Sequence, residues 1–155
     1  MVKFDFSYEE LQNSVEEILK YLSGKRTDVA ADYFRYVACN ADSPLLRRLF
    51  RESLLWMAVK MMSVWKGAEY GEDAVTVSLE GNSNECDRLL SGTEFRCLFE
   101  EALLYRTIFL WLRLTGWSEA GYWEEKSAAL LEEIWQACRD AGRIKPLKTR
   151  DSGPF

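Results

Sequence analysis

The residues that could carry acid–base or nucleophilic chemistry are limited first by the absence of histidine from the 155 residues. Histidine is the usual base in Ser-His-Asp and Cys-His nucleophilic systems and a common zinc ligand. These sites are therefore excluded, as is the Glu-x-x-His di-iron site of helical bundles. An enzyme built from this chain would need an uncommon general base near neutral pH.

Carboxylates are the next candidates, and they occur as adjacent pairs. The pairs are Glu16–Glu17, Glu100–Glu101, Glu124–Glu125 and Glu132–Glu133. Neighbouring side chains on a helix point about 100° apart, so no such pair forms a carboxylate dyad by itself. We interpret the pairs as solvated helix faces, in keeping with the surface preference of Glu. Dyads drawn from two different helices stay open, and we expect no metal site and no cofactor.

Sulfur chemistry would depend on four cysteines, which are Cys39, Cys86, Cys97 and Cys138. No two of them have the Cys-x-x-Cys spacing of thiol-redox and zinc-ribbon motifs. Because Cys39, Cys97 and Cys138 lie in apolar helical contexts, we expect them to be buried thiols. The first residues lack the apolar stretch of a signal peptide, which predicts synthesis in a reducing cytoplasm.

The charge is distributed unevenly along the chain. The net charge is −5, yet residues 143–155 are basic. The charged residues of this segment are Arg143, Lys145, Lys148, Arg150 and Asp151. The rest of the chain is therefore more acidic than the total suggests, which argues against nucleic-acid binding, since that needs clustered Lys and Arg.

Apolar residues recur at helical spacing through most of the chain. The predicted helices span residues 8–23, 27 or 28–39, 44–66, 85–90, 93 to a stop at 116, and 118–141. The second half of the 44–66 helix is apolar on nearly every side, which predicts burial on several sides. The apolar runs 53–65 and 102–114 are shorter than the roughly 20 residues of a membrane span, so no membrane contact is expected.

A short segment in the middle of the chain has a different pattern. Val75, Val77 and Leu79 alternate with polar residues, which predicts a strand. Since a lone strand leaves backbone groups unpaired, it either forms a hairpin with residues 67–73 or pairs with another chain. The predicted fold class is mainly α. It is a bundle of about five helices with a small central β element (a strand near 75–80).

The domain organisation that follows is simple. Residues 1–142 form a single helical domain. Residues 143–155, which contain Pro146 and Pro154, form an extended, flexible basic tail.

Three aromatic residues cluster near the start of the last predicted helix: Trp117, Tyr122 and Trp123. They favour either an interface anchor or a core corner between two helices.

Five short segments carry a resemblance to a known family. They are Phe6-Ser7-Tyr8-Glu9-Glu10-Leu11, Tyr21-Leu22-Ser23-Gly24-Lys25, Val75-Thr76-Val77-Ser78-Leu79, Tyr122-Trp123-Glu124-Glu125-Lys126 and Arg143-Ile144-Lys145-Pro146-Leu147-Lys148. In their order along the chain, these segments resemble the small head–tail connector, or neck, proteins of tailed bacteriophages and prophages.

The resemblance implies a virion structural protein without an active site, made in the host cytoplasm. Such proteins are ring-forming adaptors between portal and tail, so the implied partners are portal or tail proteins and other copies of the chain. The strand would pair with a neighbour, and the tail would become ordered on assembly. The expected partner-contact residues are Val75, Val77, Leu79, Arg143, Lys145, Lys148 and Arg150.

Two other functions stay open. A small acidic cytosolic binding protein, such as a toxin-immunity or other inhibitory protein, would use its acidic body to attract a basic partner. An enzyme or small-ligand protein would use carboxylates from different helices or the Cys97 thiol.

Overall fold

The computed structural model describes residues 1–24, 43–114, 116 and 118–151, with the side chains of 1–21, 44–114, 116 and 118–140. The elements in chain order are β1 (Val2–Ser7), α1 (Tyr8–Gly24), α3 (Ser43–Lys60), β2 (Trp65–Tyr70), β3 (Ala74–Leu79), α4 (Asn84–Leu90), α5 (Thr93–Leu114) and α6 (Ala120–Asp151). The fold is mainly α with a small antiparallel sheet, as the sequence predicts. The predicted helix from residue 27 or 28 to 39 lies outside the described residues.

The three strands form one antiparallel sheet in the order β1-β3-β2. Of the two pairings that the sequence left open, the hairpin forms, because β2 pairs with β3 through Ala68↔Val77 and Tyr70↔Val75. On its other side, β3 pairs with β1 through Phe4↔Val77. β3 is therefore the central strand, and both of its edges are paired within the chain.

Strand β1 was not among the predicted elements. Its side chains alternate, with Val2, Phe4 and Phe6 buried and Lys3 and Asp5 exposed. This is the period-two pattern of a half-buried strand, but it directly precedes the strong capping signal of α1. The backbone of residue 10 donates to Ser7 Oγ at 3.4 Å, so the capping interaction begins where the strand ends.

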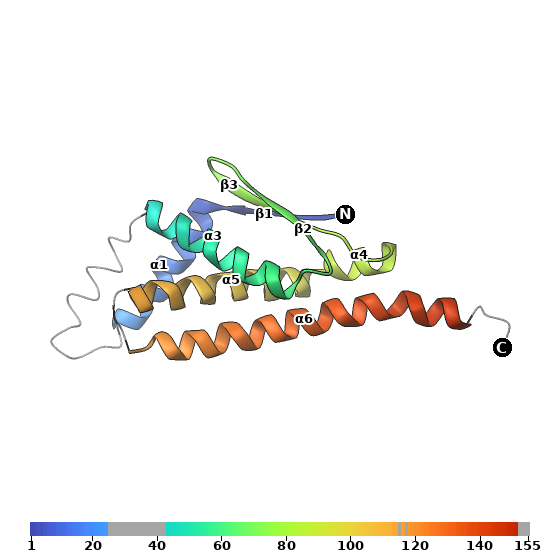
Figure 1. Ribbon diagram of the computed structural model, residues 1–155. Coiled ribbons are helices and arrows are strands. Elements are labelled where there is room, and N and C mark those ends of the chain that lie inside the picture. Colours follow the sequence, from blue (N-terminus) through green and yellow to red (C-terminus); the bar gives the residue numbers. More distant parts are fainter. Residues whose placement is uncertain (25–42, 115, 117, 152–155) are drawn as a thin grey trace.

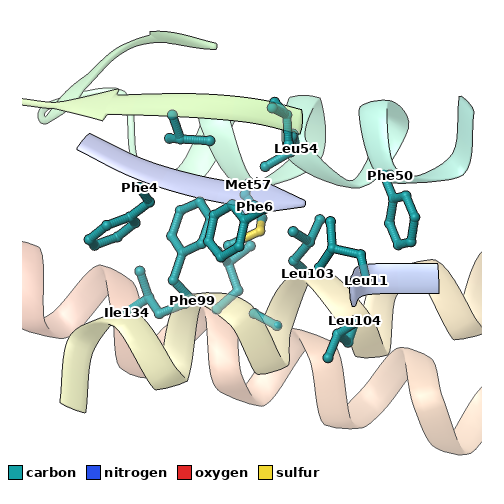
Figure 2. Close-up of a cluster of buried hydrophobic side chains, with 14 of the residues drawn as sticks. Phe4, Phe6, Leu11, Phe50, Leu54, Met57, Phe99, Leu103, Leu104 and Ile134 are labelled. Carbon is teal, nitrogen blue, oxygen red and sulfur yellow. The ribbon is translucent and has the colours of Figure 1, made fainter. Parts of the chain in front are cut away.

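The apolar face of the sheet packs on α5, the central helix of the molecule (Figure 1). Phe99 of α5 lies against two strand residues, with ring centroids 5.4 Å from Phe4 and 5.7 Å from Phe6. Figure 2 shows these rings together with Leu103 and Met57 in one cluster. Helix α5 is covered by the sheet and by α1, α3 and α6, and its residues 102–112 are accordingly buried on nearly every side.

Helix α3 is shorter than predicted. It ends at Lys60, whereas the sequence predicts a helix to residue 66. The reason is tertiary, since Trp65 already pairs with Leu79 as the first residue of β2. Backbone groups that pair in the sheet ladder are not available to a helix. The stop predicted at Gly67 is instead a strand position beside an irregularity in the register.

Helix α6 is longer than predicted, and the expected extended tail is wrong for residues 143–151, which continue the helix. Figure 1 shows this end of α6 running past α4 and away from the body. Once a helix is nucleated, each further residue adds a hydrogen bond, and Leu, Lys and Arg are good helix formers. The helix continues through Pro146, although proline lacks a backbone donor and its ring crowds the carbonyl four residues earlier.

Candidate functional site

Helix α3 has one buried face and one exposed face. Its buried face includes Leu54 and Met57, which are fully buried against the core. On the opposite face, Leu55 is 59% exposed and Val59 is 74% exposed, and Met62, just past the helix end, is 75% exposed. We call Leu55, Val59 and Met62 the α3 stripe. Their spacing of four and three residues places them on one side of the helix.

The α3 stripe corrects a prediction, because the sequence suggested that this half of the helix is buried on several sides. Instead, α3 is covered mainly by α5, and its outer side is left open. The same spacing that marks a core-facing stripe also marks a stripe facing solvent. Exposed apolar side chains that follow one another on an open side of a helix make this surface a candidate for protein binding.

The preceding turns of the exposed face carry arginines held by tyrosine rings. The Arg47 guanidinium lies 4.7 Å from the centroid of the Tyr8 ring. The Arg51 guanidinium lies 4.4 Å from the centroid of the Tyr70 ring. Arg47 also donates from Nη1 to the backbone oxygen of residue 72 at 2.9 Å. Stacking of this kind fixes the plane of a guanidinium and leaves N–H groups at its edge for an acceptor.

Neither of these arginines forms an ion pair within the described residues. The neighbouring Arg48 does, with Glu52 at 3.7 Å. Burial raises the pKa of Tyr8 above its ordinary value, and the positive charges of Arg47 and Arg51 oppose this shift. Both tyrosine hydroxyls therefore stay protonated at neutral pH, since burial raises the pKa of Tyr70 as well. The cluster is cationic and carries neutral hydroxyls.

A polar hollow of about 430 Å³ adjoins Arg47 where β1, α1 and the hairpin turn meet. It is lined by Ser7, Glu9, Gln12, Asn13, Arg47 and Asp73. The carboxylates of Glu9 and Asp73 oppose the arginine charge, so this hollow is no dedicated anion pocket.

The exposed face of α6 has the opposite charge. Glu124, Glu125, Glu132 and Glu133 are all exposed on it. Glu132 forms an ion pair with Lys60 at 3.2 Å, and Lys60 lies over the Trp135 ring. The predicted interpretation of these acidic pairs as solvated helix faces is confirmed.

The cysteines are placed differently from the prediction. Cys97 is exposed, which contradicts the expected burial, whereas Cys138 is buried as predicted. Cys86 is also buried, and it lines a hollow of about 180 Å³ together with Cys138. Burial raises the pKa of the Cys138 thiol to about 11, so this thiol is almost never ionised near neutral pH. Cys39 lies outside the described residues.

Three of the predicted partner-contact residues are in the core. Val75, Val77 and Leu79 are fully buried, so the prediction that they contact a partner is wrong for the folded chain. The physical reason is β1, which occupies the edge of β3 that the sequence left open. Residues 143, 145, 148 and 150 belong to the last turns of α6, where the structure describes only the backbone.

The two described residues of the aromatic cluster, Tyr122 and Trp123, differ in burial. Trp123 is buried, and its ring centroid lies 5.1 Å from that of Tyr105 in an edge-to-face contact. Tyr122 is 55% exposed and packs against the edge of Trp123. Trp117 lies outside the described residues. The core-corner interpretation therefore holds for Trp123, and Tyr122 is a surface residue.

The described residues contain neither a metal-ligand cluster nor a membrane-spanning helix. Among the residues that the structure describes, no three acidic or cysteine side chains gather closely enough to hold a metal ion. Within the same residues, none of the helices is both long and apolar enough to span a bilayer.

Comparison with known proteins gave no match: neither a protein-family model, nor a curated protein, nor a solved structure is similar to this chain.

Proposed function

We propose that the chain is a non-enzymatic assembly protein that acts by binding other proteins. The observation that carries this proposal is the α3 stripe of Leu55, Val59 and Met62, which follows the exposed, ring-stacked Arg47 and Arg51 along the chain. Aromatic-supported arginines beside exposed apolar side chains are the composition of protein interfaces.

Within this class, the resemblance to head–tail connectors of tailed bacteriophages supplies the specific proposal. The chain then docks between portal and tail in the virion, after synthesis in the host cytoplasm. We call the exposed side of α3, with Arg47, Arg48, Arg51 and the α3 stripe, the α3 face. In this proposal the α3 face makes the partner contact that the sequence predicted for Val75, Val77 and Leu79. Residues 143–151, with Arg143, Lys145, Lys148 and Arg150, are a second contact segment, because α6 carries them away from the body (Figure 1).

The test is peptide mass spectrometry on density-banded phage particles induced from the source culture. We expect several copies of the chain per particle and cross-links between the chain and the portal. Intact particles that lack the chain would refute the connector proposal.

A second candidate function is supported by the acidic face of α6. Its exposed glutamates favour a small inhibitory protein that binds a basic partner, such as a toxin. Association of this kind is fast and weakens steeply as salt is added. A pull-down at low and high ionic strength tests it, and a complex that is equally stable in both would contradict it.

A further inference from the structure

Two exposed faces of this molecule complement each other in charge. The α3 face carries Arg47, Arg48 and Arg51, and only Arg48 has an ion pair among the described residues. The exposed face of α6 carries an excess of glutamates, of which Glu125 and Glu133 form no ion pair in the described part of the chain. The bases on the same helix, Lys126 and Arg139, lie over the rings of Tyr122 and Trp135.

The arginines of the α3 face are positioned before any partner arrives. Tyr8 and Tyr70 come from α1 and β2, so two separate elements hold the guanidiniums of Arg47 and Arg51 in place. A side chain that is already ordered loses less conformational entropy when it binds a carboxylate. Arginine also binds carboxylates through two parallel hydrogen bonds, which adds specificity.

The apolar part of the α3 face comes next: Leu55 and Val59 lie one and two turns beyond Arg51, and Met62 lies just past the helix end. Val59 and Met62 are among the most exposed large apolar side chains of the described residues. The α6 face offers Ala128 and Ala129 between its two glutamate pairs, together with the exposed ring of Tyr122. Small residues flanked by charges let a second helix approach closely while its arginines reach the glutamates.

Within one chain, the arginines of the α3 face form no ion pair with α6 among the described residues. Helices α3 and α6 both pack on α5 with their buried sides, so their exposed sides point away from it (Figure 1). The contact between α3 and α6 in one chain is made at the end of α3 by Lys60, which reaches Glu132 and Trp135. Apart from this contact, Arg47 and Arg51 on α3 and Glu125 and Glu133 on α6 are available to another molecule.

We propose that the α3 face of one copy binds the α6 face of a second copy. The occupant of the α3 stripe is thus another copy of this chain. Because the two faces are different, each copy keeps one α3 face and one α6 face for further neighbours. Repetition of such a contact closes into a ring or extends as a filament. This inference rests on the proposed assembly function and names the partner and the surface it uses.

The experiment is sedimentation velocity on the full chain over a range of concentrations, using the wild type and three variants. The α3-face variant is Val59→Glu, and the α6-face variant is Glu125→Lys combined with Glu133→Lys. The control variant is Leu89→Glu, because Leu89 is 52% exposed on α4, outside both faces. Circular dichroism and thermal unfolding check that each variant is folded.

We expect the wild type and the control to associate as concentration rises, and less so at high salt. Each face variant alone should associate about tenfold more weakly or worse. A mixture of the two face variants should form a heterodimer and stop there. The α3-face variant keeps an intact α6 face, and the α6-face variant keeps an intact α3 face. These two intact faces bind each other.

Three results would overturn the inference. The first is a wild type that stays monomeric at every concentration, and the second is self-association of the α6-face variant at wild-type strength. The third is a mixture of variants that forms no heterodimer. The proposed function fails by a different result, intact particles that lack the chain. Particles that contain the chain, alongside a chain that is monomeric in solution, would keep the connector role and remove self-association.

Discussion

Two groups of three apolar residues differ from the sequence prediction in opposite ways. The group predicted at a surface is buried, and the group predicted in the core is exposed. Val75, Val77 and Leu79 of β3 were expected at a partner surface, and all three are fully buried. Leu55, Val59 and Met62 of α3 were expected in the core, and all three are more than half exposed.

The difference between the two groups lies in what covers each element. β3 is covered on one side by β1 and on the other by β2, and its apolar face packs on α5. α3 has α5 on one side and solvent on the other. An apolar residue becomes part of a core only when another element covers it, and a local pattern does not say whether one does.

The sharpest test of this comparison is the same substitution in both groups. Val77→Asn places an amide in the core beside apolar side chains, so it should lower the free energy of unfolding by about 3 kcal/mol or more. Val59→Asn should change it by less than about 0.5 kcal/mol, because residue 59 is exposed and Val and Asn have similar helix propensities. Urea denaturation measures both values. Equal losses would contradict the burial described here.

Gly81 and Gly67 provide the same contrast between a covered and an open position, here for a Cβ atom added to the backbone. A Cβ at residue 81 would lie 2.3 Å from the Cβ of Cys86, so Gly81→Ala requires the packing of α4 to shift. We expect a loss of about 1 to 3 kcal/mol in unfolding free energy. At residue 67, in the edge strand β2, a Cβ would meet nothing within 4 Å. Gly67→Ala should be neutral or stabilise by up to about 0.5 kcal/mol, because it restricts the unfolded chain. Thermal unfolding of the two variants decides between these outcomes.

A buried hydroxyl pair tests how the covered side of α3 is held. Ser53 Oγ and Thr107 Oγ1 lie 3.1 Å apart, and each also lies within hydrogen-bond distance of a carbonyl four residues earlier. Two hydroxyl protons cannot serve all three contacts at once. Thr107→Val should therefore cost about 1 kcal/mol, and the double variant with Ser53→Ala should cost less than the sum of the two single changes. A strictly additive double-mutant cycle would show that the two hydroxyls do not interact.

The smallest expected effect concerns the contact between the N-terminus and α4. Asp87 accepts a hydrogen bond from the backbone N–H of residue 81 at 2.7 Å and pairs with the N-terminal ammonium at 3.1 Å. The hydrogen bond from Gly81, followed by the bond from the ammonium, lowers the pKa of Asp87 in the folded state. This contribution to stability is therefore present above the ordinary pKa of aspartate, and it is lost as pH falls through the lowered value.

Asp87→Asn should accordingly reduce stability at neutral pH and make little difference in strong acid. Urea midpoints of wild type and variant at neutral pH and in acid measure the effect. A gap between the two proteins that does not narrow toward acid would show that the Asp87 charge makes no such contribution.

Much of the fold was predictable because its signals are local. Helices α1, α5 and most of α6 follow from periodic apolar residues and capping positions, and β3 follows from its alternation and the turn residues after it. Whether β3 pairs with residues 67–73 or with another chain stayed open in the sequence. Strand β1 has a clear alternation over its six residues, but the start signal of the helix that follows is stronger and masks it.

The candidate site was not predictable in the same way. Arg47 meets Tyr8, and Arg51 meets Tyr70, across separations that no local spacing can reveal. The α3 stripe does have a signal in its spacing, yet the same spacing describes a core face equally well.

The amino-acid sequence by itself determined the helical class, the absence of histidine chemistry, the acidic balance of the chain and the position of strand β3. These properties depend on residue type and on neighbours a few positions away, so they survive without knowledge of the three-dimensional fold. Only the tertiary structure decided which apolar residues are covered, where α3 ends and which arginines are held by tyrosines. Each of these depends on a contact between segments far apart in the chain, and such contacts form only when the whole core assembles.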